Sequence, residues 1–94
     1  MAQIYDSAKV RNAARTVRAL NERLEDGAMR PERKAFRESE PLNGKAAEAL
    51  RERLQRLEEN TRRICAELGS VSAELNRYAN ALDEVGAKLT REML

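Results

Sequence analysis

Few residues of this sequence could do covalent or acid–base chemistry, and their spacing predicts no catalytic site. Cys65 is the single cysteine, and the chain contains no histidine that could activate it. A thiol becomes a good nucleophile only where a base or a positive charge stabilises its thiolate. The acidic pairs Glu58-Glu59 and Asp83-Glu84 are sequence neighbours, and adjacent residues of a helix do not face each other. The sequence therefore predicts no enzyme, no cofactor and no metal site.

Two groups of arginines could contact phosphates. Arg11, Arg15 and Arg18 share a helical face, and Arg62-Arg63 form a second group. Acidic residues are interspersed, the net charge is only +2 and aromatics make up 3% of the chain. Binding of nucleic acid normally needs a strongly basic face, and single strands also need stacking side chains. We therefore expect solvated helix faces and no nucleic-acid partner.

The composition predicts a small helical protein that associates with another polypeptide. The chain has 94 residues, of which 36% are charged and 41% hydrophobic. So small an apolar content leaves a lone chain of this length little margin of stability. Apolar runs do not exceed three residues, which predicts no membrane insertion. No charged segment followed by an apolar one opens the chain, so no signal peptide is expected and a cytoplasmic location is predicted.

The first expected helix covers about residues 6–39. Asp6 suits its N-cap, and Tyr5 with Val10 would form a hydrophobic staple. One face of its first half carries apolar residues at helical spacing, namely Val10, Ala13, Val17, Leu20 and Leu24.

A break or kink is expected in this helix near residues 27–31. Gly27 could end it, and Pro31 could open a further short helix. Alternatively the helix runs on to about Ser39 with a kink at the proline. The segment 41–44, Pro-Leu-Asn-Gly, is a strong turn signal, with Asn43 as the expected N-cap of a second helix.

The second expected helix, about residues 44–92, carries an unbroken heptad repeat, which predicts coiling against another helix. Its a positions are Ala47, Leu54, Thr61, Leu68, Leu75, Leu82 and Leu89. Its d positions are Leu50, Leu57, Ile64, Val71, Tyr78 and Val85. The e positions are Arg51 and Glu58, followed by the small residues Cys65, Ser72, Ala79 and Gly86. Small residues beside the seam let another helix approach closely, and Thr61 could set the register.

These elements predict an all-α fold of one domain, residues 1–94. It is an antiparallel two-helix hairpin with a long heptad second helix, completed as a helical bundle with a partner. The first helix begins near Asp6, so it should cover the second helix only to about Asn80. The apolar residues beyond that point, up to Leu94, should then need another polypeptide.

The order of elements and the turn resemble the WXG superfamily of type VII secretion. In that family a W-x-G turn is followed by Ala-rich residues and a bulky apolar one. Here Leu42, Asn43 and Gly44 take the place of the turn, and Ala46, Ala47, Ala49 and Leu50 follow. Leu42 replaces the tryptophan, and the family's Y-x-x-x-D/E export signal is not matched, because Leu82 stands four residues after Tyr78. The chain is thus most similar to the small Trp-less helical partners of LXG-type toxins.

This resemblance implies a function, a partner surface and a route of export. The chain would be an adaptor that binds the N-terminal helical domain of a larger toxin and targets it for type VII secretion. It would itself be cytoplasmic or exported without a signal peptide. The turn glycine would let the second helix start close to the first, and Leu42 would fill the end of the hairpin. The expected partner-binding residues are Leu68, Val71, Leu75, Tyr78, Leu82, Val85, Leu89 and Met93.

Two other functions remain open at this level. One is a WXG-like homodimer or heterodimer, formed by self-association or with a second small helical protein, that is secreted in its own right. The other is a structural coiled-coil scaffold. A scaffold would pair its seam in parallel and tolerate any turn sequence, whereas the other functions need an antiparallel hairpin.

Overall fold

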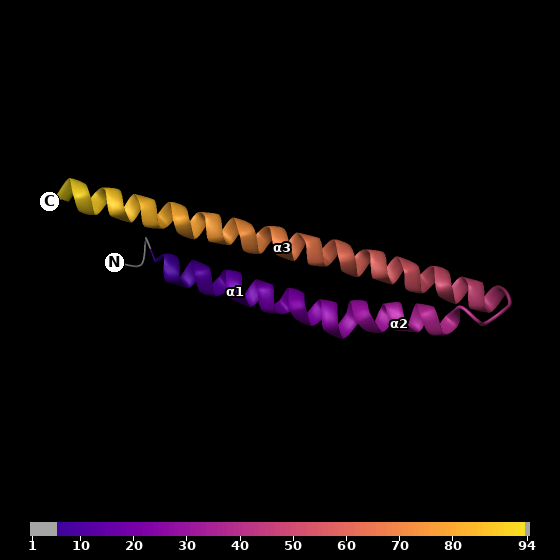
Figure 1. Ribbon diagram of the computed structural model, residues 1–94. Coiled ribbons are helices and arrows are strands. Elements are labelled where there is room, and N and C mark those ends of the chain that lie inside the picture. The colour runs from indigo at the N-terminus through magenta and orange to yellow at the C-terminus, as the bar shows by residue number, and fades with distance from the viewer. Residues whose placement is uncertain (1–5, 94) are drawn as a thin grey trace. The chain divides into compact units, whose positions relative to one another are not determined.

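The computed structural model describes residues 6–93, and this part of the chain is all-α (Figure 1). Helix α1 (Ser7–Leu24), the π-helical turn η2 (Glu25–Met29) and helix α2 (Arg30–Ser39) follow one another without a gap. A five-residue connection, 40–44, leads into the long helix α3 (Lys45–Met93). The expected fold class, an antiparallel hairpin of two helical arms, is confirmed.

Contacts within the chain group into two units. Among the described residues, one unit contains residues 6–19 and 68–93, and the other contains residues 20–67. In the second unit, Ser39 pairs with Arg51 and Glu32 pairs with Thr61. The residue numbers of the partners thus increase along one arm as they decrease along the other, which is the antiparallel order. The first unit shows the same order, because Ala14 pairs with Ser72 and Arg11 pairs with Asp83.

The start of α1 follows the sequence signal. The Asp6 carboxylate accepts hydrogen bonds from the amides of Ala8 and Lys9, at 3.1 and 3.3 Å. These amides have no acceptor inside the helix, so the side chain supplies one. The N-cap predicted at Asp6 is therefore confirmed. The staple between Tyr5 and Val10 and the apolar end at Leu94 lie outside the described residues.

The irregularity expected near residues 27–31 is a π-helical turn. The amide of Arg30 donates to the carbonyl of Glu25, five residues earlier. Pro31 has no amide hydrogen, and its ring would collide with the carbonyl of Gly27 in a regular α-helix. The wider turn accommodates the proline in the first turn of α2, so neither Gly27 nor Pro31 ends the helical path.

The connection between α2 and α3 depends on one glycine and one arginine. Gly44 has a φ of 106°, a conformation that only glycine adopts without strain. Its carbonyl accepts from the Glu48 amide at 3.0 Å, so Gly44 is the N-cap of α3. The Arg51 guanidinium donates to the carbonyls of Ser39 and Leu42, at 2.8 and 2.9 Å.

Three expectations for this connection are wrong. Asn43 does not cap α3, because the first helical hydrogen bond is accepted one residue later, at Gly44. A side chain at Gly44 would meet nothing within 4 Å, so its role is backbone conformation and not close helix approach. Leu42 does not fill the end of the hairpin, because 51% of its surface is exposed.

We predict that Gly44→Ala lowers the free energy of unfolding by about 1–2 kcal/mol, because alanine is strained at positive φ. Gly86→Ala is the matched control. Gly86 lies within α3, and a Cβ there also meets nothing within 4 Å. That change should raise stability by up to ~1 kcal/mol. Thermal and urea unfolding followed by circular dichroism measure both effects, and an equal or more stable Gly44→Ala chain would contradict the prediction.

Candidate partner-binding surface

The face that α3 turns inward consists of its a and e positions. In the second unit Cys65 is buried, and Leu54 and Thr61 are half-buried. In the first unit Ser72 and Ala79 are buried. The predicted seam placed the d positions beside the a positions on one buried face, and for the d positions this prediction is wrong. The small e positions noted in the sequence explain the difference, because they allow the other arm to pack over them.

The d positions of α3 form an exposed stripe, which we call the d stripe. Each of its side chains keeps between 42% and 56% of its surface exposed. Its members are Leu50, Leu57, Ile64, Val71, Tyr78 and Val85. Exposed apolar side chains at seven-residue spacing on one helix mark a surface for association with protein. A further helical partner or self-association would cover them.

The first arm differs from expectation in the same way. Ala14 is buried while Ala13 is exposed, and 47% of Leu20 is exposed. Ala13 and Leu20 therefore do not face α3, although Val10, Val17 and Leu24 are half-buried.

The expected partner-binding residues divide into two sets. Leu68, Leu75 and Leu82 are half-buried in a positions. Val71, Tyr78, Val85, Leu89 and Met93 are exposed.

The start of α1 reaches further along α3 than the sequence indicated. Arg11 forms an ion pair with Asp83 and donates to the Asn80 amide oxygen. Hydrogen bonds from Ser7 and then from Arg11 hold the pKa of Asp83 below its usual value. Leu82, which precedes Asp83, is half-buried. Further along α3, Leu89 is the first exposed a position, at 38% of its surface, and Met93 exposes 85%.

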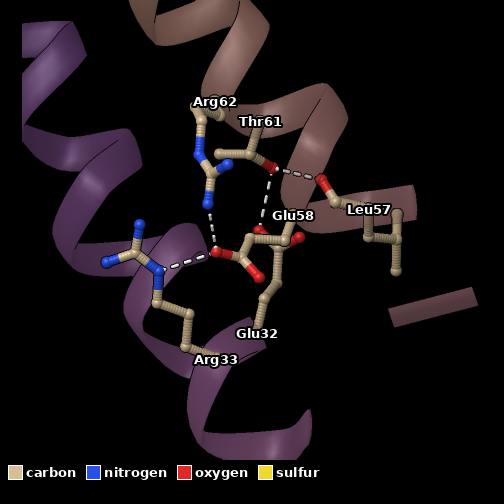
Figure 2. Close-up of polar contacts among 6 residues, drawn as sticks. All are labelled: Glu32, Arg33, Leu57, Glu58, Thr61 and Arg62. Atoms are coloured by element: carbon tan, nitrogen blue, oxygen red, sulfur yellow. Dashed lines mark hydrogen bonds and ion pairs between the residues drawn. The ribbon is translucent and has the colours of Figure 1, made fainter. Parts of the chain in front are cut away.

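Glu58 is the centre of a polar cluster in the second unit. Figure 2 shows its carboxylate between the guanidinium groups of Arg33 and Arg62, each 2.8 Å away. The Arg33 hydrogen bond is the largest cause that lowers the pKa of Glu58, although partial burial opposes it. Glu58 thus occupies an inward e position with its charge paired, as burial requires.

Thr61, the polar residue in the heptad seam, contacts the other arm. Its hydroxyl lies 2.8 Å from the Glu32 carboxylate and 2.9 Å from the Leu57 carbonyl (Figure 2). One hydroxyl hydrogen serves these two acceptors. The second carboxylate oxygen of Glu32 is buried and accepts no hydrogen bond within the described part of the chain. This cross-arm contact favours the register role expected for Thr61.

Cys65 is a buried, free thiol. Burial is the largest cause that raises its pKa, and the charges of Glu25 and Glu32 add to the effect. A raised pKa keeps the sulfur protonated and weakly nucleophilic. Across residues 6–93, no three acidic, cysteine or histidine residues are grouped so that they could hold a metal ion.

The candidate phosphate-binding arginines do not act as one group. Arg11 pairs with Asp83, Arg15 donates to Asn12, and Arg62 pairs with Glu58. In the described residues no helix has an apolar stretch that could cross a bilayer.

Comparison of the chain with family models, with curated proteins and with solved structures found no match in any of the three. The resemblance of Leu42–Gly44 and the following residues to the WXG superfamily therefore stays a prediction.

We predict that Glu58→Gln lowers the free energy of unfolding by about 1 kcal/mol at pH 7. The pKa of Glu58 is lower in the folded chain than in the unfolded one, so its charge stabilises the fold above the ordinary glutamate range. This contribution should fade as pH falls from about 5 to 3, and the two chains should then be equally stable. Glu59→Gln is the control, because Glu59 is exposed. A pH series of urea unfolding curves makes the comparison, and identical curves for both variants would contradict the prediction.

We also predict that Cys65 reacts with a disulfide reagent at pH 8 at least about ten times more slowly in the folded chain than in urea. A Cys65→Ser chain with Ser70→Cys provides the control, because Ser70 is exposed. Absorbance of the released thiolate gives both rates. If Cys65 and the control cysteine at position 70 react at equal rates in the folded chains, Cys65 is accessible and the prediction is wrong.

Proposed function

We propose that this chain is a helical association module whose two arms supply part of a larger helical bundle. The d stripe is the observation that carries the proposal. Its six side chains repeat every seven residues along α3, as a packing seam does, yet each is about half exposed. A helix laid along the d stripe would remove this apolar surface from water, which is a principal source of affinity between helices.

The total surface supports the same conclusion. The chain exposes 7433 Å², whereas a compact monomer of 10.7 kDa exposes about 5500 Å². The excess, roughly 1900 Å², is larger than the ~800 Å² that each partner of a standard protein interface buries.

We further propose that the partner is the N-terminal helical domain of a larger LXG-type toxin, and that the chain acts as its adaptor for type VII secretion. The antiparallel hairpin, the Gly44 turn and the Ala-rich start of α3 support this proposal, because the resemblance rests on the same features. The antiparallel pairing favours a hairpin-based function over a parallel coiled-coil scaffold. A secreted dimer of hairpins remains the alternative, and complex composition separates the two.

The test is co-expression with the product of the adjacent open reading frame, followed by size exclusion with mass measurement. We expect a complex that contains both chains. Ile64→Asp with Val71→Asp should reduce recovery of the partner at least about tenfold, because each change places a charge in an apolar seam. Ala66→Asp with Ala73→Asp is the matched control, since both alanines are exposed at f positions of α3 and should leave binding unchanged.

Two results would contradict the proposals. Unchanged partner recovery with Ile64→Asp and Val71→Asp would show that the d stripe is not the interface. A complex that contains only copies of this chain would overturn the adaptor role and support the secreted dimer.

A further inference from the structure

The d stripe of the second unit has a cationic border. In the part of α3 that belongs to the second unit, residues 45–67, the g and c positions that adjoin the d positions contain one acidic residue, Glu67, at the far end. They contain three arginines, Arg53, Arg56 and Arg63. Acidic residues of the same segment, such as Glu52 and Glu59, stand at f positions, further from the d stripe.

These three arginines have no ion-pair partner among the described residues. Arg33 and Arg62, by contrast, share the Glu58 carboxylate, and Arg51 binds two backbone carbonyls. Arg56 borders Glu52 and Glu59 around a shallow hollow, but it bonds to neither. The cations beside the d stripe are therefore available to an incoming molecule.

An open hollow lies where the cationic border meets the d stripe. Leu57, Arg53, Arg56 and Asn60 line it, and its volume is about 340 Å³. Leu57 exposes 52% of its surface, so the hollow offers an apolar contact with two guanidinium groups beside it. A side chain of a bound helix could enter it while carboxylates one turn away meet the arginines.

We propose that this surface binds an amphipathic helix of the partner whose apolar stripe is bordered by acidic residues. The inference rests on the proposed function and adds the charge of the partner helix. A second copy of this chain fits less well, because a two-fold contact centred on Leu57 sets each arginine against the arginines of the other copy. Exposed ion pairs add modest affinity but discriminate strongly between partners of opposite charge.

The experiment uses the full chain and two synthetic 28-residue amphipathic peptides with the same leucine stripe. One peptide carries glutamate at every position beside the stripe, and the other carries lysine. Fluorescence anisotropy should show that the glutamate peptide binds at least about ten times more tightly at low salt, and the ratio should shrink at ~0.5 M salt because the charges are exposed.

Charge reversal tests whether the named arginines are responsible. Arg53→Glu with Arg63→Glu should abolish or invert the preference for the glutamate peptide. Arg18→Glu with Arg37→Glu is the matched control, because it changes the net charge equally on exposed residues of α1 and α2 and should keep the preference. Circular dichroism establishes that both variants remain helical.

The outcomes separate this inference from the proposed function. Equal binding of the two peptides, or an unchanged preference after Arg53→Glu with Arg63→Glu, would overturn the acidic partner and leave the association module standing. Absence of binding by either peptide at 100 µM would also overturn it, while co-expression with the large partner tests the module separately.

Discussion

Close packing at small residues decides which face of α3 is buried. In the first unit Ala14 and Ala79 expose at most 2% of their surfaces, and the Ser72 hydroxyl donates to the Ala14 carbonyl at 3.2 Å. Such contacts need side chains that let two backbones approach. Because the small residues stand at e positions, the other arm packs over the a and e positions. Tyr78 and the other d positions of this unit therefore remain exposed.

The second unit buries the same face with different chemistry. Its e positions include Arg51 and Glu58, which would be costly in a helix interface if they were unpaired. Arg51 satisfies the carbonyls at the end of α2, and Glu58 is held by Arg33 and Arg62. Paired charges in this unit, like small residues in the other, therefore allow the e positions of α3 to face the first arm. In both units the d positions remain uncovered, so the exposed d stripe results from the way in which the hairpin closes.

Local signals in the sequence predicted the helices, the cap at Asp6 and the turn at Gly44, because each depends on the conformation of a few neighbouring residues. They did not predict which half of the heptad seam faces inward. Apolar a and d positions are equally suited to the other arm of the hairpin and to a partner, and only the e positions distinguish the two. Arg51 was also missed as a stabiliser of the turn, since its acceptors are carbonyls nine and twelve residues earlier.

The π-helical turn also determines how α2 is oriented about its own axis. Up to Ala28 the inward residues of the first arm repeat every seven residues. The buried Met29 follows Ala28 directly, so every later inward residue lies one position further along the sequence than this repeat predicts. A residue added to or removed from a helix turns everything after it by about 100°. A regular α-helix of the same length would therefore turn Glu32, Arg33 and Ser39 away from their partners on α3, whereas the wide turn absorbs the extra residue and keeps these residues in place. Loss of one residue together with the wide turn would leave the inward face of α2 unchanged, whereas loss of the wide turn alone would not.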